Sequence, residues 1–275
     1  MEHLTAEVRG IQISYTMTNP DAIESIVFLH GFTGSWRSWE SVIKLLPRDI
    51  NCISIDLMGH GSTEVSSNPE RYRMNEQLLD LAEFFSAIQL TRFSLVGYSM
   101  GGRIALAYAL EHPQQVKNLV LESASPGLKT IEEQQLRRQA DDQLADRIEQ
   151  DGLESFIGFW ENISLFESQK SLSNEKQHEI RSERLAQSAV GLANSLRGMG
   201  TGQQPSYWSK LDELEMPVYL VTGEYDTKFT EIADEMVKKL KDGSHLQVSS
   251  VGHAIHVENP VQFATIIMEQ LIDGN

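Results

Sequence analysis

Short apolar runs recur along the first half of the chain, and each is followed by a polar or glycine-containing segment. Uninterrupted apolar runs of this length are typical of strands that are buried on both faces of a parallel sheet. Residues 6–17, bent near Gly10, predict one or two further short strands. The four buried runs are residues 26–29, 51–56, 93–96 and 118–121.

Helical patterns lie between these runs. One spans residues 73–89, with apolar side chains spaced for a single helix face, and another spans residues 103–110. Strands that alternate with helices indicate a mostly parallel sheet with right-handed crossovers and helices on both faces. The apolar positions of the first helix are Leu78, Leu81, Phe85 and Ile88.

The alternation stops after residue 127 and resumes near residue 217. The intervening sequence is charged, helical in pattern and without a buried-strand run. We therefore predict an α/β core built from residues 1–127 and 206–275, with a helical lid over residues 128–205. The elements expected after the lid are a strand over 218–222, a helix over 229–240, a strand over 244–250 and a helix over 260–272.

Composition narrows the class of protein. The chain has 275 residues and a formal net charge of −16, so it lacks the basic surface of a nucleic-acid or anionic-membrane binder. No apolar run reaches the ~18 residues of a membrane span, and the first residues do not resemble a signal peptide. Cys52 is the sole cysteine, which fits a reducing cytoplasm. We expect a cytoplasmic monomer or small homo-oligomer, with Cys52 buried.

The candidate chemistry centres on Gly97-Tyr98-Ser99-Met100-Gly101, a Gly-x-Ser-x-Gly motif between an apolar run and a helical pattern. This context predicts a sharp strand-to-helix turn that presents the Ser99 hydroxyl. Glycines on either side leave room for such a turn. The Met100 N–H, at the start of the helix, is a candidate oxyanion donor.

A serine hydroxyl needs a base to take its proton, and the base needs a group that orients it. Asp226 follows the strand over 218–222, and His253 follows the strand over 244–250. The order Ser99, Asp226, His253 is that of an α/β-hydrolase triad. Glu224 and His256 are weaker alternatives for the acid and the base. No His or Cys cluster has metal-ligand spacing, and we expect no metal and no cofactor.

The second oxyanion donor is expected in the loop after the strand over 26–29. That loop is His30-Gly31-Phe32, and the Phe32 N–H is the candidate. His30 is expected to pack and to hold the loop by hydrogen bonds.

These features resemble the α/β-hydrolase superfamily over nearly the whole chain. A narrower set resembles MenH, the 2-succinyl-6-hydroxy-2,4-cyclohexadiene-1-carboxylate synthases of the menaquinone pathway. Tyr98 and Arg103 on either side of Ser99 also match that family. The segments that carry the narrower resemblance are residues 121–128, 137–141, 159–161, 165–166, 195–203, 223–229 and 252–260.

The resemblance implies a lyase that eliminates pyruvate from a small substrate with several carboxylates, with Ser99 as the base. An acidic protein needs local cations to hold such an anion. The resemblance places Arg103, Arg138 and Arg197 at carboxylate positions, with Arg137 as an alternative to Arg138. It makes Trp160 and Tyr98 walls of the pocket. Three other lid arginines are expected to face solvent: Arg147, Arg181 and Arg184.

Two other classes remain open on the sequence alone. An ester or thioester hydrolase would use the same triad through an acyl-enzyme, and a ligand-binding receptor could retain the triad without turnover. A hydrolase for neutral substrates would leave Arg103 and Arg197 without a partner.

Overall fold

The computed structural model describes residues 1–272. Its centre is a sheet whose strand order is β1-β2-β4-β3-β5-β6-β7-β8, which confirms the expected mostly parallel α/β architecture. The β1–β2 and β2–β4 pairs are antiparallel, and every pairing from β4 through β3 to β8 is parallel. The strands are β1 (Glu2–Val8), β2 (Ile11–Met17), β3 (Ser25–Leu29), β4 (Asn51–Ile55), β5 (Phe93–Tyr98), β6 (Val116–Glu122), β7 (Val218–Gly223) and β8 (Gly243–Val248).

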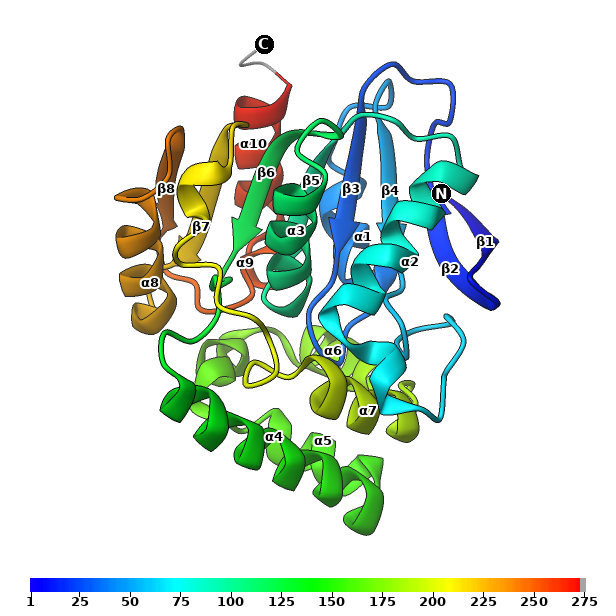
Figure 1. Ribbon diagram of the computed structural model, residues 1–275, viewed down its shortest axis with the longest axis vertical. Helices are drawn as coiled ribbons and strands as arrows, with labels where there is room; N and C mark the ends of the chain where they lie inside the picture. The colour runs from blue at the N-terminus through cyan, green and yellow to red at the C-terminus, as the bar shows by residue number, and fades with distance from the viewer. Residues whose placement is uncertain (273–275) are drawn as a thin grey trace.

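Helices cover both faces of the sheet (Figure 1). Apolar side chains of α2, α3 and α8 belong to one large core, and those of α1 and α10 belong to a second core on the opposite face. β3, β4 and β5 are buried along their whole length, as expected for strands between two helical layers. The helices of the core are α1 (Glu40–Ile43), α2 (Met74–Ala87), α3 (Met100–Glu111), α8 (Thr227–Val237), α9 (Ile255–Glu258) and α10 (Pro260–Leu271), with short 3-10 helices η1 (Trp36–Trp39), η2 (Pro69–Tyr72) and η4 (Leu211–Glu213).

The lid lies beneath the carboxyl ends of the parallel strands (Figure 1). It has a small apolar core of its own, centred on Phe156, Ile157 and Leu192. All of its elements fall within residues 128–205. They are α4 (Ile131–Asp151), α5 (Leu153–Trp160), the 3-10 segment η3 (Ser164–Ser171), α6 (Asn174–Leu185) and α7 (Ala189–Met199).

Close contacts join the lid to the core, among them one between two glycines and one between aromatic rings. Gly191 of α7 packs against the backbone of Gly59, and a Cβ on Gly191 would lie 2.1 Å from the Gly59 carbonyl oxygen. Phe32, in the loop after β3, makes edge contacts with the Phe156 and Trp160 rings of the lid. The lid is therefore packed against the loops at the strand ends, where the candidate site residues are expected.

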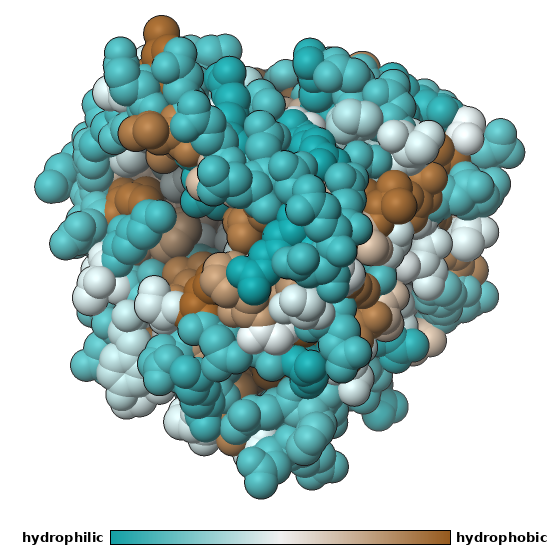
Figure 2. Space-filling model, turned by 90° about the horizontal axis from the view of Figure 1, so that it is seen from below, coloured by the Kyte–Doolittle hydropathy of each residue, from teal (hydrophilic) through white to brown (hydrophobic). Residues whose placement is uncertain are grey.

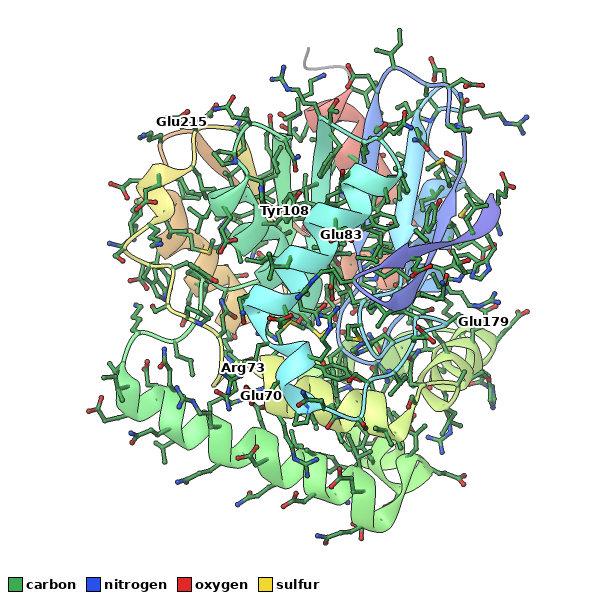
Figure 3. All side chains as sticks on the ribbon, turned by 45° about the vertical axis from the view of Figure 1, so that its right-hand side comes forward. Glu70, Arg73, Glu83, Tyr108, Glu179 and Glu215 are labelled. Carbon is green, nitrogen blue, oxygen red and sulfur yellow. The ribbon has the colours of Figure 1, made fainter. Side chains whose placement is uncertain are left out.

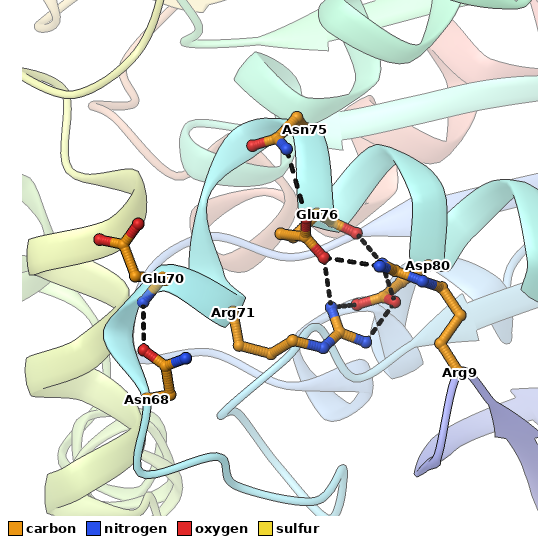
Figure 4. Close-up of polar contacts among 7 residues, drawn as sticks. All are labelled: Arg9, Asn68, Glu70, Arg71, Asn75, Glu76 and Asp80. Carbon is orange, nitrogen blue, oxygen red and sulfur yellow. Dashed lines mark hydrogen bonds and ion pairs between the residues drawn. The ribbon is translucent and has the colours of Figure 1, made fainter.

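A cluster of charged side chains fastens α2 to the β1–β2 hairpin (Figure 4). The Asp80 carboxylate accepts hydrogen bonds from Arg71 at 2.6 and 2.7 Å and from Arg9 at 2.9 Å. Glu76 also pairs with Arg9. Asp80 is 3% exposed, so its charge depends on these arginines for compensation.

Many of the acidic residues lie on the surface. Glu70, Glu179 and Glu215 are exposed in separate parts of the chain and project outward (Figure 3). Figure 2, which looks onto the lid side, shows a largely hydrophilic surface with apolar residues gathered around a depression. Within residues 1–272, no helix combines the length and apolar character needed to cross a membrane.

Asp80→Ala is expected to lower the free energy of unfolding by about 2 kcal/mol, because it leaves two arginine side chains without their shared buried carboxylate. Urea denaturation followed by circular dichroism measures the change. Glu83→Ala removes an exposed carboxylate from the same helix and serves as the control, for which we expect almost no change. Equal effects of the two substitutions would contradict a stabilising role for the Arg9–Asp80–Arg71 cluster.

Candidate active site

Ser99 stands at the tight turn between β5 and α3. Its φ of 49° and ψ of −104° are strained for a residue other than glycine. The turn also packs closely, because a Cβ on Gly97 would lie 2.5 Å from the Gly101 carbonyl oxygen, and one on Gly101 would lie 2.3 Å from that of Leu29. The helix begins at Met100, three residues before the sequence pattern indicated, because no linker separates it from the turn.

The structure brings the three expected triad residues together. His253 Nε2 lies 3.1 Å from Ser99 Oγ, and His253 Nδ1 lies 2.6 Å from Asp226 Oδ2. Asp226 and His253 are 5% and 2% exposed, so the acid–base pair is shielded from water. This arrangement allows His253 to take the Ser99 proton while Asp226 stabilises the resulting imidazolium.

The two weaker alternatives lie outside the triad. Glu224 is exposed and accepts a hydrogen bond from the Ser250 N–H. His256 lies in α9 and binds the buried Glu122 carboxylate through Nδ1 at 2.8 Å. Glu122 also accepts the Ser99 N–H through its backbone carbonyl, at 2.8 Å. Glu122 thus links the tight turn at Ser99 to the segment that follows His253.

Backbone donors for an oxyanion lie at the two expected positions. Met100 is the first residue of α3, where its N–H has no acceptor within the helix. Phe32 is in the loop after β3, and both residues line the same cavity as Ser99. His30 fixes this loop, because its Nε2 accepts the Leu57 N–H at 3.0 Å and its Nδ1 lies 2.8 Å from the Gly31 carbonyl oxygen.

A cavity of about 180 Å³ lies between the triad and the lid. Apolar walls come from Tyr98, Trp160, Phe166 and Phe229, among others. The indole Nε1 of Trp160 is buried and makes no hydrogen bond with any residue from 1 to 272.

Three cationic side chains line this cavity in the described part of the chain: Arg103, Arg137 and Lys228. Arg103 is 8% exposed and donates to the Met199 carbonyl and to Gln204 Oε1, both at 3.0 Å. Burial lowers the pKa of Arg103 to about 10, and the nearby Asp141 carboxylate opposes that shift. With neutral hydrogen-bond partners, its charge is available to an anion.

Comparison with known proteins gives a consistent assignment. Residues 24–260 match the α/β hydrolase fold family. The chain is 47% identical over 262 residues to a putative 2-succinyl-6-hydroxy-2,4-cyclohexadiene-1-carboxylate synthase of Bacillus subtilis, covering 95% of both chains. It is 32% identical to the synthase of the same name from Enterobacter sp., over 90% of this chain and 91% of that protein. The solved structure of MenH from S. aureus superposes with a TM-score of 0.90 at 38% identity, covering 94% of this chain and 98% of that one.

The chain belongs to the MenH family. It is therefore an enzyme of the carbon–oxygen lyase class, built on the α/β hydrolase fold. A thermophilic esterase from Thermogutta terrifontis has a TM-score of 0.86 at 22% identity and covers 99% of each chain, a likeness that shows the fold alone.

Arg137 and Arg138, the two candidates on α4 for binding a carboxylate, point in different directions. Arg137 lines the cavity and pairs through Nε with Asp141 Oδ1 at 2.8 Å. Arg138, one residue on and therefore about 100° around the helix, donates instead to the Gly202 carbonyl. The structure does not place Arg138 at the cavity, and the alternative residue Arg137 takes that position.

Arg197 also lies elsewhere than expected. Its neighbours Leu196 and Met199 line the cavity from α7, whereas Arg197 pairs with Glu149 at 2.6 Å and Asp146 at 2.7 Å on α4. The two carboxylates hold its side chain between the lid helices and away from the cavity. The sequence pattern of α7 does not reveal which face of the helix is turned toward the cavity.

Sequence reasoning missed two cations. Lys228 lines the cavity, but it follows Asp226 so closely that the motif drew attention to the acid alone. Arg184 was expected to face solvent, and this was wrong, because it is 7% exposed with its guanidinium 4.6 Å from the Phe166 ring centroid. Among residues 1–272, no group of three or more His, Cys, Asp or Glu side chains is arranged to hold a metal ion.

We expect acid to lower the stability of the fold through His30, which holds the loop after β3. Burial lowers the pKa of His30 from 6.5 to about 4, so the unfolded chain binds this proton more readily than the folded chain. The free energy of unfolding should therefore fall as the pH decreases from 6.5 to 4. Urea denaturation of the parent and of His30→Gln across this range measures the effect, and the variant should show a shallower slope. His178→Gln, on the exposed side of α6, should keep the parent's slope; if His30→Gln also keeps it, His30 is not the cause.

Proposed function

We propose that this enzyme eliminates pyruvate from 2-succinyl-5-enolpyruvyl-6-hydroxy-3-cyclohexene-1-carboxylate and forms 2-succinyl-6-hydroxy-2,4-cyclohexadiene-1-carboxylate in menaquinone biosynthesis. The observation that carries the proposal is the position of Ser99 and His253 in a cavity that Arg103, Arg137 and Lys228 also line. Cations around a serine base suit a substrate with several carboxylates.

Binding rests on groups from both the core and the lid. Arg103 and Arg137 hold substrate carboxylates, since a guanidinium can bind a carboxylate through two parallel hydrogen bonds. The Trp160 and Tyr98 rings pack against the apolar part of the substrate. Because the lid covers the cavity, these interactions operate with little competing water.

The proton transfers follow from the triad geometry. His253 takes the Ser99 proton, and the Ser99 oxygen then removes a proton from a carbon of the substrate ring. The electron pair of that C–H bond forms a new ring double bond, the existing ring double bond shifts by one position, and the bond between the ring and the enolpyruvyl oxygen breaks. The departing enolate takes up the proton held by His253 and becomes pyruvate. Neither water nor a redox partner is consumed.

Charge that develops on the succinyl carbonyl during proton removal needs a donor. The Phe32 and Met100 N–H groups serve this role, and Met100 also benefits from the partial positive charge at the start of α3. The same two donors would suit an ester hydrolase, so assay of pyruvate release from this substrate beside hydrolysis of p-nitrophenyl esters tests the proposal. Ester hydrolysis without pyruvate release would contradict it.

Ser99→Ala should lower kcat for pyruvate release by about 10³-fold or more, because the variant loses the base that removes the ring proton. Product affinity, measured by calorimetry, should change little. Ser195→Ala removes a different hydroxyl from the same cavity and should lose far less activity. Near-normal turnover in Ser99→Ala would refute the role of Ser99 as base.

Arg137→Gln should raise KM about tenfold with a smaller change in kcat, because the side chain binds the substrate at some distance from the broken bond. Arg138→Gln and Arg197→Gln are matched controls, since each removes one guanidinium that the structure places away from the cavity. Steady-state kinetics on the three variants measures the difference. A larger KM effect from either control would contradict the placement described above.

A further inference from the structure

A second cavity adjoins the active-site cavity. Its volume is about 530 Å³, and it shares Leu165, Lys228 and His253 with the active-site cavity. Its other walls come from η3 of the lid and from the segment between β7 and α8. Tyr225 in this wall is 61% exposed, so the second cavity opens to solvent. The residues that the two cavities share therefore border an opening to bulk water.

Lys228 differs from the other two cations of the active-site cavity. Arg103 donates to a carbonyl and an amide oxygen, and Arg137 pairs with Asp141. Lys228 Nζ, by contrast, makes no hydrogen bond and no ion pair with any residue from 1 to 272; its one polar contact is with the Phe229 ring, whose centroid is 5.4 Å away. Its ammonium group is free to bind an anion on the wall between the two cavities.

Neither carboxylate that lines the second cavity makes an ion pair with this ammonium group. Asp226 is hydrogen-bonded to His253, and Glu167 pairs with Lys170 at 2.6 Å. Burial and the nearby Arg137 charge lower the pKa of Lys228, and the Asp226 charge opposes that shift. A bound anion would offset the repulsion from Arg137. Ser164 and Thr227 add hydroxyl groups to the residues that line this cavity.

We propose that the second cavity is the release site for the small 2-oxo carboxylate that leaves the substrate, and that Lys228 binds its carboxylate there. This inference rests on the proposed elimination of pyruvate. One ammonium group at an open wall binds a monoanion weakly, which suits a product that must depart. The larger ring product, with its own carboxylates, remains on Arg103 and Arg137 while pyruvate leaves through the second cavity.

Product inhibition tests the role of Lys228. Lys228→Met should raise the inhibition constant for pyruvate about tenfold, whereas inhibition by the ring product should change by less than about twofold. Lys228→Arg should keep pyruvate inhibition close to that of the parent, because the substitution keeps the positive charge. Lys238→Met, at the far end of α8, makes the same change in net charge and should behave as the parent does.

Three outcomes would overturn the release site: an unchanged inhibition constant for pyruvate in Lys228→Met, equal weakening of both products, or no inhibition of the parent by pyruvate at the highest concentration the assay tolerates. Failure of the proposed function is recognised separately. In that case the parent enzyme would form no pyruvate from the substrate at all.

A substitution that fills the second cavity tests the path itself. Ser164→Trp places a large ring at its wall from an exposed position that does not line the active-site cavity. We expect kcat to fall severalfold, with a rapid first turnover in stopped-flow experiments, because release becomes limiting. Ser171→Trp, exposed on the same 3-10 segment but outside both cavities, is the control. Equal kinetics for the two tryptophan variants would exclude this path.

Discussion

The strained turn at Ser99 is the constraint on which the site depends. A residue with φ of 49° and ψ of −104° persists only where its surroundings hold it. Here the Ser99 N–H donates to the Glu122 carbonyl on β6, and Gly101 lies against the end of β3. Ser99 is therefore held by the strands on either side of β5, namely β3 and β6. The Glu122 carboxylate extends this support to α9, which directly follows the His253 loop.

The charged side chains that line the cavity are mostly positive, whereas the molecule as a whole is strongly negative. The chain carries a formal charge of −16, yet Arg103, Arg137 and Lys228 line the cavity around Ser99. Asp141 partly offsets Arg137 and, being 1% exposed, also accepts the Gly202 N–H at 3.2 Å. One buried carboxylate thus fixes an arginine of α4 and a turn after α7. A local excess of cations in an acidic protein creates a positive potential that favours anions at that place over the rest of the surface.

Packing of the lid against the core positions several residues that line the cavity. Phe32 carries one of the candidate oxyanion donors, and its ring contacts Trp160, which lines the cavity from the lid. The close approach of Gly59 and Gly191 sets the position of α7, whose Leu196 and Met199 form another wall. Because the loop that carries the Phe32 N–H contacts the lid, the position of this candidate oxyanion donor depends on the packing of the lid.

The sequence alone determined the alternating strands and helices, the interruption by a helical lid, and the order of Ser99, Asp226 and His253. These features are local or follow from topology: periodicity reports burial, and parallel strands bring their carboxyl ends to one edge. The tertiary structure decided which arginines face the cavity. Adjacent residues on a helix point about 100° apart, so choosing Arg137 over Arg138 requires the helix orientation. Likewise, Arg197 is held away from the cavity by two carboxylates that are some 50 residues distant in the chain. Arg184 is buried against Phe166, and Lys228 also lines a second cavity. Such partners are set by packing between distant segments, and no pattern within a single segment encodes them.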